Sequence, residues 1–154
     1  PYLGFGSMRP FLDAASAHGG GVFIVALTSN PEGPQVQHAV AADGRTVAQS
    51  LLDEISARNK GVEPLGSVGA VIGATTGPTG HDLSRLNGPV LAPGLGAQGA
   101  TADDLPVVFA RLNGVVLPSY SREILAHGPS VAGLRDAASR AEAKCRKVLK
   151  YQLS

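Results

Sequence analysis

Cysteine, methionine and charged residues are scarce in this chain of 154 residues. Cys145 is the only cysteine, which excludes an intrachain disulfide and a cluster of thiolate metal ligands. The 13 basic and 12 acidic groups nearly cancel, so no broad basic surface for nucleic acid is expected. No apolar run approaches the ~20 residues of a membrane span, and no signal peptide opens the chain. These absences predict a cytoplasmic protein that binds neither nucleic acid nor membrane.

What the chain does contain is a large apolar fraction and many glycines. Hydrophobic residues make up 44% of the sequence, which is enough to bury a core and excludes wholesale disorder. The length fits one domain. The chain begins at Pro1 and its only methionine is Met8, so we expect it to be part of a longer polypeptide.

Four continuous apolar runs have the length of buried strands, and each ends in a loop of small, polar, glycine or proline residues. They cover residues 21–27, 68–74, 89–92 and 114–117. Such runs predict strands that are covered on both faces. Helical spacing of apolar residues predicts helices over residues 7–18, 35–58, 81–86, 102–112 and 130–151.

Strands that alternate with helices predict parallel pairing with right-handed crossovers. Two α/β architectures fit, an open doubly wound sheet and part of a (β/α)₈ barrel, because four strands cannot close a barrel. Both bind ligands at the carboxyl ends of their strands. The loops to consider are therefore residues 28–33, 75–80, 93–99 and 118–123.

The glycine-rich loop over residues 93–99 is the most informative of the four. Gly94, Gly96 and Gly99 follow a predicted strand and precede a predicted helix, a spacing that lets backbone N–H groups converge on an anion. The same spacing occurs in the dinucleotide-binding fingerprint, which expects an acidic residue about 20 positions later. Here the next strand ends without an acid before Glu123, which disfavours a dinucleotide. A glycine turn without a ligand stays open as an alternative.

A second informative loop contains Arg122, directly after the last predicted strand. A guanidinium group can hold a phosphate through two parallel N–H bonds. Pairing of Arg122 with Glu123 or with solvent is the alternative. The two loops together predict a phosphate site, because barrels often build one from the loops after their last two strands.

These stretches resemble the orotidine 5′-phosphate decarboxylase family. Residues 93–99 and 121–122 look like its phosphate-binding region, while residues 2–4 and 28–31 resemble loops of its bacterial branch. The resemblance implies that residues 1–154 are the C-terminal portion of a single (β/α)₈ barrel domain, about strands five to eight. It also implies decarboxylation of orotidine 5′-monophosphate to uridine 5′-monophosphate without a metal or organic cofactor, in a homodimer.

The resemblance also implies roles for individual residues. Gln98 and Arg122 would hold the 5′-phosphate, helped by backbone N–H groups near Gly96, Gly99 and Ser121. In the glycine loop, Gly94 completes the pattern. The pyrimidine amide edge would contact Ser29, in a loop shaped by Asn30 and Pro31.

The family's Asp-x-Lys-x-x-Asp motif, whose lysine protonates the carbanion, is absent from this sequence. The four lysines, none of which lies in such a pattern, are Lys60, Lys144, Lys147 and Lys150. We therefore expect the acid–base centre in a missing N-terminal half of the barrel, and no decarboxylation by this chain alone. Two alternatives stay open: another phosphate-binding barrel enzyme, and an independent nucleotide-binding module without chemistry.

Overall fold

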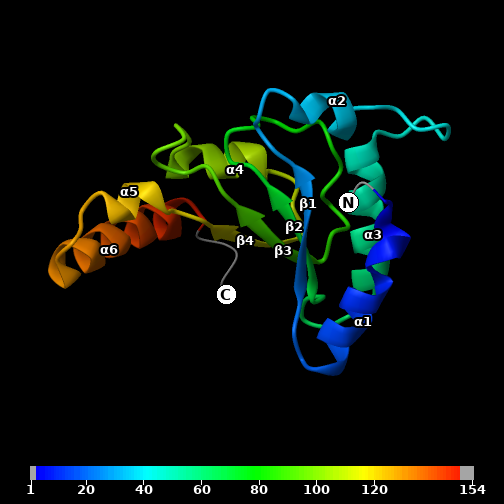
Figure 1. Ribbon diagram of the computed structural model, residues 1–154, viewed down its shortest axis with the longest axis horizontal. Helices are drawn as coiled ribbons and strands as arrows, with labels where there is room; N and C mark the ends of the chain where they lie inside the picture. The colour runs from blue at the N-terminus through cyan, green and yellow to red at the C-terminus, as the bar shows by residue number, and fades with distance from the viewer. Residues whose placement is uncertain (1–2, 150–154) are drawn as a thin grey trace.

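Four parallel strands in sequence order form the centre of the molecule (Figure 1). The computed structural model describes residues 3–149, so the expectations at Pro1, Tyr2 and residues 150–154 lie outside the described residues. The strands are β1 (Val22–Leu27), β2 (Val68–Ile72), β3 (Gly88–Ala92) and β4 (Gly114–Pro118). All four lie where the apolar runs predicted them, and the parallel order is confirmed.

One face of the sheet is packed against helices and forms the core. The strand register aligns one buried side chain from each strand, namely Ile24, Ala70, Val90 and Val116. The helix α1 (Arg9–Ala17) packs on β1, and α3 (Val47–Asn59) packs on β1, β2 and β3. Leu52 and Ile55 of α3 are fully buried in this layer.

The opposite face is open, which corrects the prediction that the strands are covered on both faces. Its central row, which we call the open row, consists of side chains in register across the sheet: Val25, Val71, Leu91 and Leu117. Val25 is 49% exposed and Leu117 is 40% exposed. The physical reason is that α1 and α3 pack against the other face of the sheet, which contains the core.

The first and last helices agree with the sequence prediction to within a few residues. A short 3₁₀ turn η1 (Phe5–Met8) leads into α1, with Pro10 in its first turn, where a missing N–H costs nothing. The last helix α6 (Val131–Val148) begins at Ser130, whose hydroxyl accepts a hydrogen bond from the Gly133 N–H. Figure 1 shows α6 and the short α5 (Arg122–Leu125) beside β4, away from α1 and α3.

The single helix predicted over residues 35–58 is wrong. The chain forms α2 (Gly33–Gln37) and then α3, separated by an irregular segment. In that segment Gly44 has a φ of +82°, and the Ala41 N–H donates to the Arg45 carbonyl. The apolar spacing misled because Val40, which continues the helical stripe, is 67% exposed and faces no core.

Two further predicted helices need correction. Residues 81–86 form turns and irregular structure instead of a helix, so β2 and β3 are joined without a described helix between them. The helix predicted over 102–112 is shorter, consisting of η2 (Ala102–Asp104) and α4 (Leu105–Val108). Its start was predicted correctly, because Thr101 and Asp104 form a capping box.

Candidate functional site

The loops that follow the four strands meet at one edge of the sheet, because the strands are parallel. Backbone hydrogen bonds join neighbouring loops there. The Ala74 N–H donates to the Pro93 carbonyl at 2.8 Å, and the Ser119 N–H donates to the Ala92 carbonyl at 3.0 Å. The edge therefore gathers the residues that the sequence nominated from distant parts of the chain.

The loop after β1 is held in shape by its own side chains. Gln37 of α2 accepts from the Thr28 N–H at 3.0 Å and donates to the Thr28 hydroxyl at 2.7 Å. Asn30 donates to Glu32 at 3.0 Å, and this hydrogen bond holds the pKa of Glu32 below its usual value. Asn30 thus shapes the loop, whereas the exposed Ser29 hydroxyl has no partner among residues 3–149.

A cavity of about 290 Å³ lies between this loop and the loop after β2. The two loops begin side by side, because the Gly73 N–H donates to the Leu27 carbonyl at 3.0 Å. The sequence analysis named both loops, residues 28–33 and 75–80, but it gave no role to His38, Thr75 or Thr76. A strand-end position was the only signal for the two threonines. The lining residues are Leu27, Thr28, Ser29, Asn30, Pro31, Pro34, His38, Thr75, Thr76, Pro78 and Thr79.

The glycine turn over residues 94–99 follows β3. Gly94, Gly96 and Gly99 have φ values of +105°, +72° and +101°, which other residues rarely adopt. The Gly96 N–H donates to the Ala100 carbonyl and the Gly99 N–H donates to the Gly96 carbonyl, both at 2.8 Å. These two N–H groups are therefore used to fold the turn, and the expected backbone donors near Gly96 and Gly99 must come from neighbouring residues.

Other donors of the turn remain available to a ligand. Ala97 and Gln98 are exposed at its tip. Within the described part of the chain, their backbone N–H groups and the Gln98 carboxamide have no hydrogen-bond partner. The turn can thus present one flexible amide and two backbone donors to an anion.

The glycine turn packs against the start of α5, which carries Arg122. A Cβ added to Gly96 would lie 2.6 Å from the Glu123 Cβ, so only glycine fits this contact. The glycine turn therefore lies beside the start of α5, and we call the surface formed by the turn and Arg122 the rim. The exposed Arg122 guanidinium forms no ion pair with any residue from 3 to 149, Glu123 included. Ser121 precedes it as the N-cap of α5.

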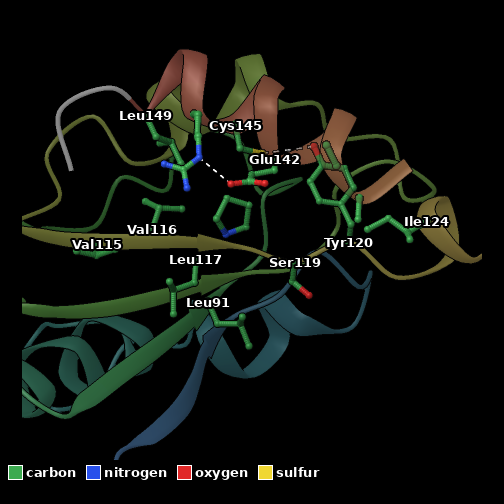
Figure 2. Close-up of a pocket in the computed structure, with 14 residues that line it drawn as sticks. Leu91, Val115, Val116, Leu117, Ser119, Tyr120, Ile124, Glu142, Cys145 and Leu149 are labelled. Atoms are coloured by element: carbon green, nitrogen blue, oxygen red, sulfur yellow. Dashed lines mark hydrogen bonds and ion pairs between the residues drawn. The ribbon is translucent and has the colours of Figure 1, made fainter. Parts of the chain in front are cut away.

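A further cavity, of about 690 Å³, lies elsewhere, between the edge strand β4 and α6. Figure 2 shows Leu91 and Leu117 of the strands on one side of it and Cys145 of α6 on the other. The Cys145 thiol donates to the Tyr120 hydroxyl at 3.7 Å, and burial raises the pKa of Tyr120 above its usual value. The walls of this cavity are mainly apolar, so it is suited to packing. The polar groups that could bind a ligand lie at the glycine turn and Arg122 instead.

Neither a cluster of metal-binding side chains nor a membrane-spanning helix occurs among the described residues. No three His, Cys, Asp or Glu side chains from 3 to 149 come close enough to share a metal ion. His38 and His81 are neighbours, with ring centroids 5.9 Å apart, a pairing that the sequence did not reveal. No helix in this range is long and apolar enough to cross a bilayer.

Four parallel strands in sequence order, with helices on one face and the candidate loops at their carboxyl ends, define an α/β protein built from the β/α units of a barrel. The comparison with known proteins is more specific. Residues 1–137 match the orotidine 5′-phosphate decarboxylase / HUMPS family, and the chain belongs to this family.

Individual relatives support the same conclusion. The orotidine 5′-phosphate decarboxylase of Salinispora arenicola is 64% identical over 149 residues, which cover 97% of this chain and 54% of that protein. That of Streptomyces coelicolor is 56% identical over 141 residues, 91% of this chain and 50% of that protein. The crystal structure of a candidate orotidine 5′-phosphate decarboxylase from Streptomyces avermitilis superposes with a TM-score of 0.90, at 52% identity, over 97% of this chain and 53% of that one.

The chain spans about half the length of the curated relatives that it matches, and the matched part is their C-terminal half. The four-stranded sheet is accordingly half of a barrel. This explains the open row, which in a closed barrel of parallel strands points toward the interior.

Proposed function

We propose that this chain forms the phosphate- and pyrimidine-binding half of an orotidine 5′-phosphate decarboxylase, which converts orotidine 5′-monophosphate to uridine 5′-monophosphate and CO₂. The observation that carries the proposal is the packing of Gly96 on Glu123, which sets the glycine turn beside Arg122. The family membership supports the choice of a nucleotide as the ligand.

Phosphate binding is assigned to the rim formed by the glycine turn and α5. Arg122 supplies a charge-assisted hydrogen bond, worth about 1.5–3 kcal/mol. Gln98 supplies its carboxamide, and the unpartnered N–H groups at the tip of the turn supply further donors. Gly94, Gly96 and Gly99 contribute the shape of the turn, and Ser121 leads the chain into α5.

Pyrimidine binding is assigned to the cavity beside the loop after β1. The free Ser29 hydroxyl contacts the amide edge of the ring, while Asn30 and Pro31 hold the loop. Contacts with the phosphate are remote from the reacting carbon. Their binding energy can still promote the reaction, because it can stabilise a closed, catalytic arrangement of loops.

The proton for the nascent carbanion comes from outside this chain in our proposal. No lysine here lies in an Asp-x-Lys-x-x-Asp pattern. The N-terminal half of the barrel would supply that motif and cover the open row, and the complete enzyme would act as a homodimer without a cofactor. We therefore expect no turnover of orotidine 5′-monophosphate by the purified 154-residue chain.

Binding of uridine 5′-monophosphate, measured by NMR titration, tests the assignment. Arg122→Ala removes the guanidinium and is expected to weaken binding roughly tenfold to a hundredfold, since a charged hydrogen bond is lost. The matched control is Arg135→Ala, at an exposed position of α6, which should bind as the unchanged chain does. Equal binding by the Arg122 variant and its control would contradict the assignment.

A further inference from the structure

The hydroxyl of Thr75, in the loop after β2, is buried without a partner. In the part of the chain that the structure describes, it is the single buried side-chain oxygen or nitrogen without a hydrogen bond. Burying a hydroxyl in this way is unfavourable by an amount comparable to a lost hydrogen bond. The neighbouring Thr76 does not have this cost, because its hydroxyl donates a hydrogen bond to the Gly73 carbonyl at 2.8 Å.

The Thr75 side chain lies beneath the glycine turn. A Cβ added to Gly94 would lie 3.5 Å from both the hydroxyl oxygen and the methyl carbon of Thr75. The same point is 3.7 Å from Oε1 of Gln98. Thr75 also lines the cavity that contains Ser29. It therefore stands between the loop assigned to the pyrimidine and the turn assigned to the phosphate.

The chemistry of Gln98 supplies a partner for this hydroxyl. A carboxamide that binds an anion must turn its N–H₂ group toward the ligand, which leaves its carbonyl oxygen in need of a donor. Neither the Thr75 hydroxyl nor the Gln98 carboxamide has a partner within residues 3–149. One donor and one acceptor, both unpaired, thus lie within 3.7 Å of the same point, the position that a Cβ on Gly94 would take.

We propose that Thr75 is a positioning residue that donates its hydroxyl proton to Oε1 of Gln98 when a phosphate is bound, and so aims the Gln98 N–H₂ group at that phosphate. This inference rests on the proposed function, because it takes the nucleotide phosphate as the anion. The unfavourable burial in the free chain is offset only when the ligand orders Gln98.

Two variants of Thr75 separate this role from a structural one. Thr75→Val keeps the shape of the side chain and removes the hydroxyl, so its thermal midpoint should be equal to or above that of the unchanged chain. Affinity for uridine 5′-monophosphate should fall roughly tenfold, the factor that corresponds to one hydrogen bond. Thr75→Ser keeps the hydroxyl and should restore affinity. Thr76→Val, which loses a satisfied hydroxyl, should instead lower the thermal midpoint.

Comparing two ligands shows whether the loss of affinity in Thr75→Val depends on the phosphate group. Uridine lacks the phosphate, so Thr75→Val should bind it as the unchanged chain does. In a Gln98→Ala background the Thr75→Val substitution should cause no further loss for uridine 5′-monophosphate, because the proposed acceptor is gone.

The possible failures are distinguishable. If the unchanged chain binds uridine 5′-monophosphate and Thr75→Val binds it equally well, the role of Thr75 is wrong and the proposed function stands. An equal loss for uridine and its monophosphate, or an undiminished effect in the Gln98→Ala background, also contradicts the positioning role. If the unchanged chain binds neither ligand, nor inorganic phosphate, both proposals are wrong.

Discussion

At the scale of single residues, the rim depends on positions where a side chain has no room. Gly96 combines a positive φ with close packing against Glu123. This contact, and not the number of glycines, sets the turn beside Arg122. The glycine pattern in the sequence pointed to the correct turn, although the N–H groups of Gly96 and Gly99 serve the turn itself.

Replacing this glycine tests the contact. Gly96→Ala should destabilise the chain by about 1–2 kcal/mol through backbone strain and by about 1–3 kcal/mol more through the clash with Glu123. Gly44→Ala is the matched control, because its φ is +82° but no atom lies within 4 Å of the added Cβ. Urea unfolding measures both variants. Equal losses in the two would show that Glu123 moves aside freely.

Asn59 joins the starts of β2 and β3, at the end of the sheet opposite the candidate site. It is 1% exposed, and its Nδ2 donates to the carbonyls of Val68 at 2.7 Å and Leu86 at 3.0 Å. Gly66 and Gly88 leave the space that its side chain fills. One amide at the end of α3 thus fixes the starts of two strands.

We expect Asn59→Ala to lower the free energy of unfolding by about 2–4 kcal/mol, because two buried carbonyls lose their donor. Asn113→Ala removes the same amide group from an exposed position and should change stability by less than about 0.5 kcal/mol. Chemical unfolding of the two variants provides the measurement. A loss at Asn59 no larger than that at Asn113 would refute the role.

At the scale of elements, α3 begins where a side chain caps it. The Thr46 hydroxyl accepts from the Gln49 N–H at 3.0 Å and lies 3.0 Å from Nε2 of His81. Nδ1 of His81 is 2.7 Å from the Thr79 carbonyl, which can only accept. Nδ1 therefore carries the proton in the neutral ring, and Nε2 accepts from the Thr46 hydroxyl. The cap links α3 to the irregular connection that replaces the helix predicted over 81–86.

The capping hydroxyl has a measurable effect. Thr46→Ala should reduce stability by about 1 kcal/mol, and Thr46→Ser should recover most of that loss because the hydroxyl is retained. The stabilities of the unchanged chain and the two Thr46 variants are compared by thermal unfolding. If the serine variant is as unstable as the alanine variant, the methyl group and not the cap accounts for the effect.

Burial lowers the pKa of His81 below its ordinary value of 6.5; the hydrogen bond to the Thr79 carbonyl opposes this shift in part, and the nearby His38 adds slightly to it. The unfolded chain then binds more protons than the folded one as the pH falls through 6.5. Stability should be complete above this pH and should decrease below it. His81→Gln should flatten this dependence in urea titrations between pH 5 and pH 8, about the range of histidine titration. The exposed His127→Gln is the control, and an unchanged slope in the His81 variant would contradict the prediction.

At the scale of the whole molecule, half of a barrel leaves an apolar surface that a complete one would bury. The open row runs from β1 to β4, the two outer strands, each of which has one unpaired edge in the described sheet. Unpaired strand edges and exposed apolar faces promote association. The isolated chain is therefore expected to self-associate.

Sedimentation velocity tests this expectation. Leu117→Lys places a charge in the open row and should shift the chain toward monomer. Val107→Lys changes an equally apolar side chain, 58% exposed on α4 and outside the row, and should leave association unchanged. A monomeric unchanged chain, cooperative in unfolding, would instead favour an independent binding module.

The sequence alone determined the four strands, their parallel order and the loops that carry the candidate site, because buried strands of this type are continuous apolar runs bounded by glycine and proline. It also pointed to the family through residues 93–99 and 121–122. The spacing of apolar residues wrongly predicted helices over residues 35–58 and 81–86. An apolar stripe at helical spacing forms a helix only where its side chains can pack against a core.

The tertiary structure decided which groups remain available for binding. Only the fold showed that Gly96 and Gly99 use their N–H groups internally, that Arg122 is unpaired within residues 3–149, and that Thr75 is buried without a partner. Hydrogen bonding and burial depend on atoms brought together from distant parts of the chain. A residue type and its spacing specify what a side chain can do, while its neighbours in space determine whether it is free to do so.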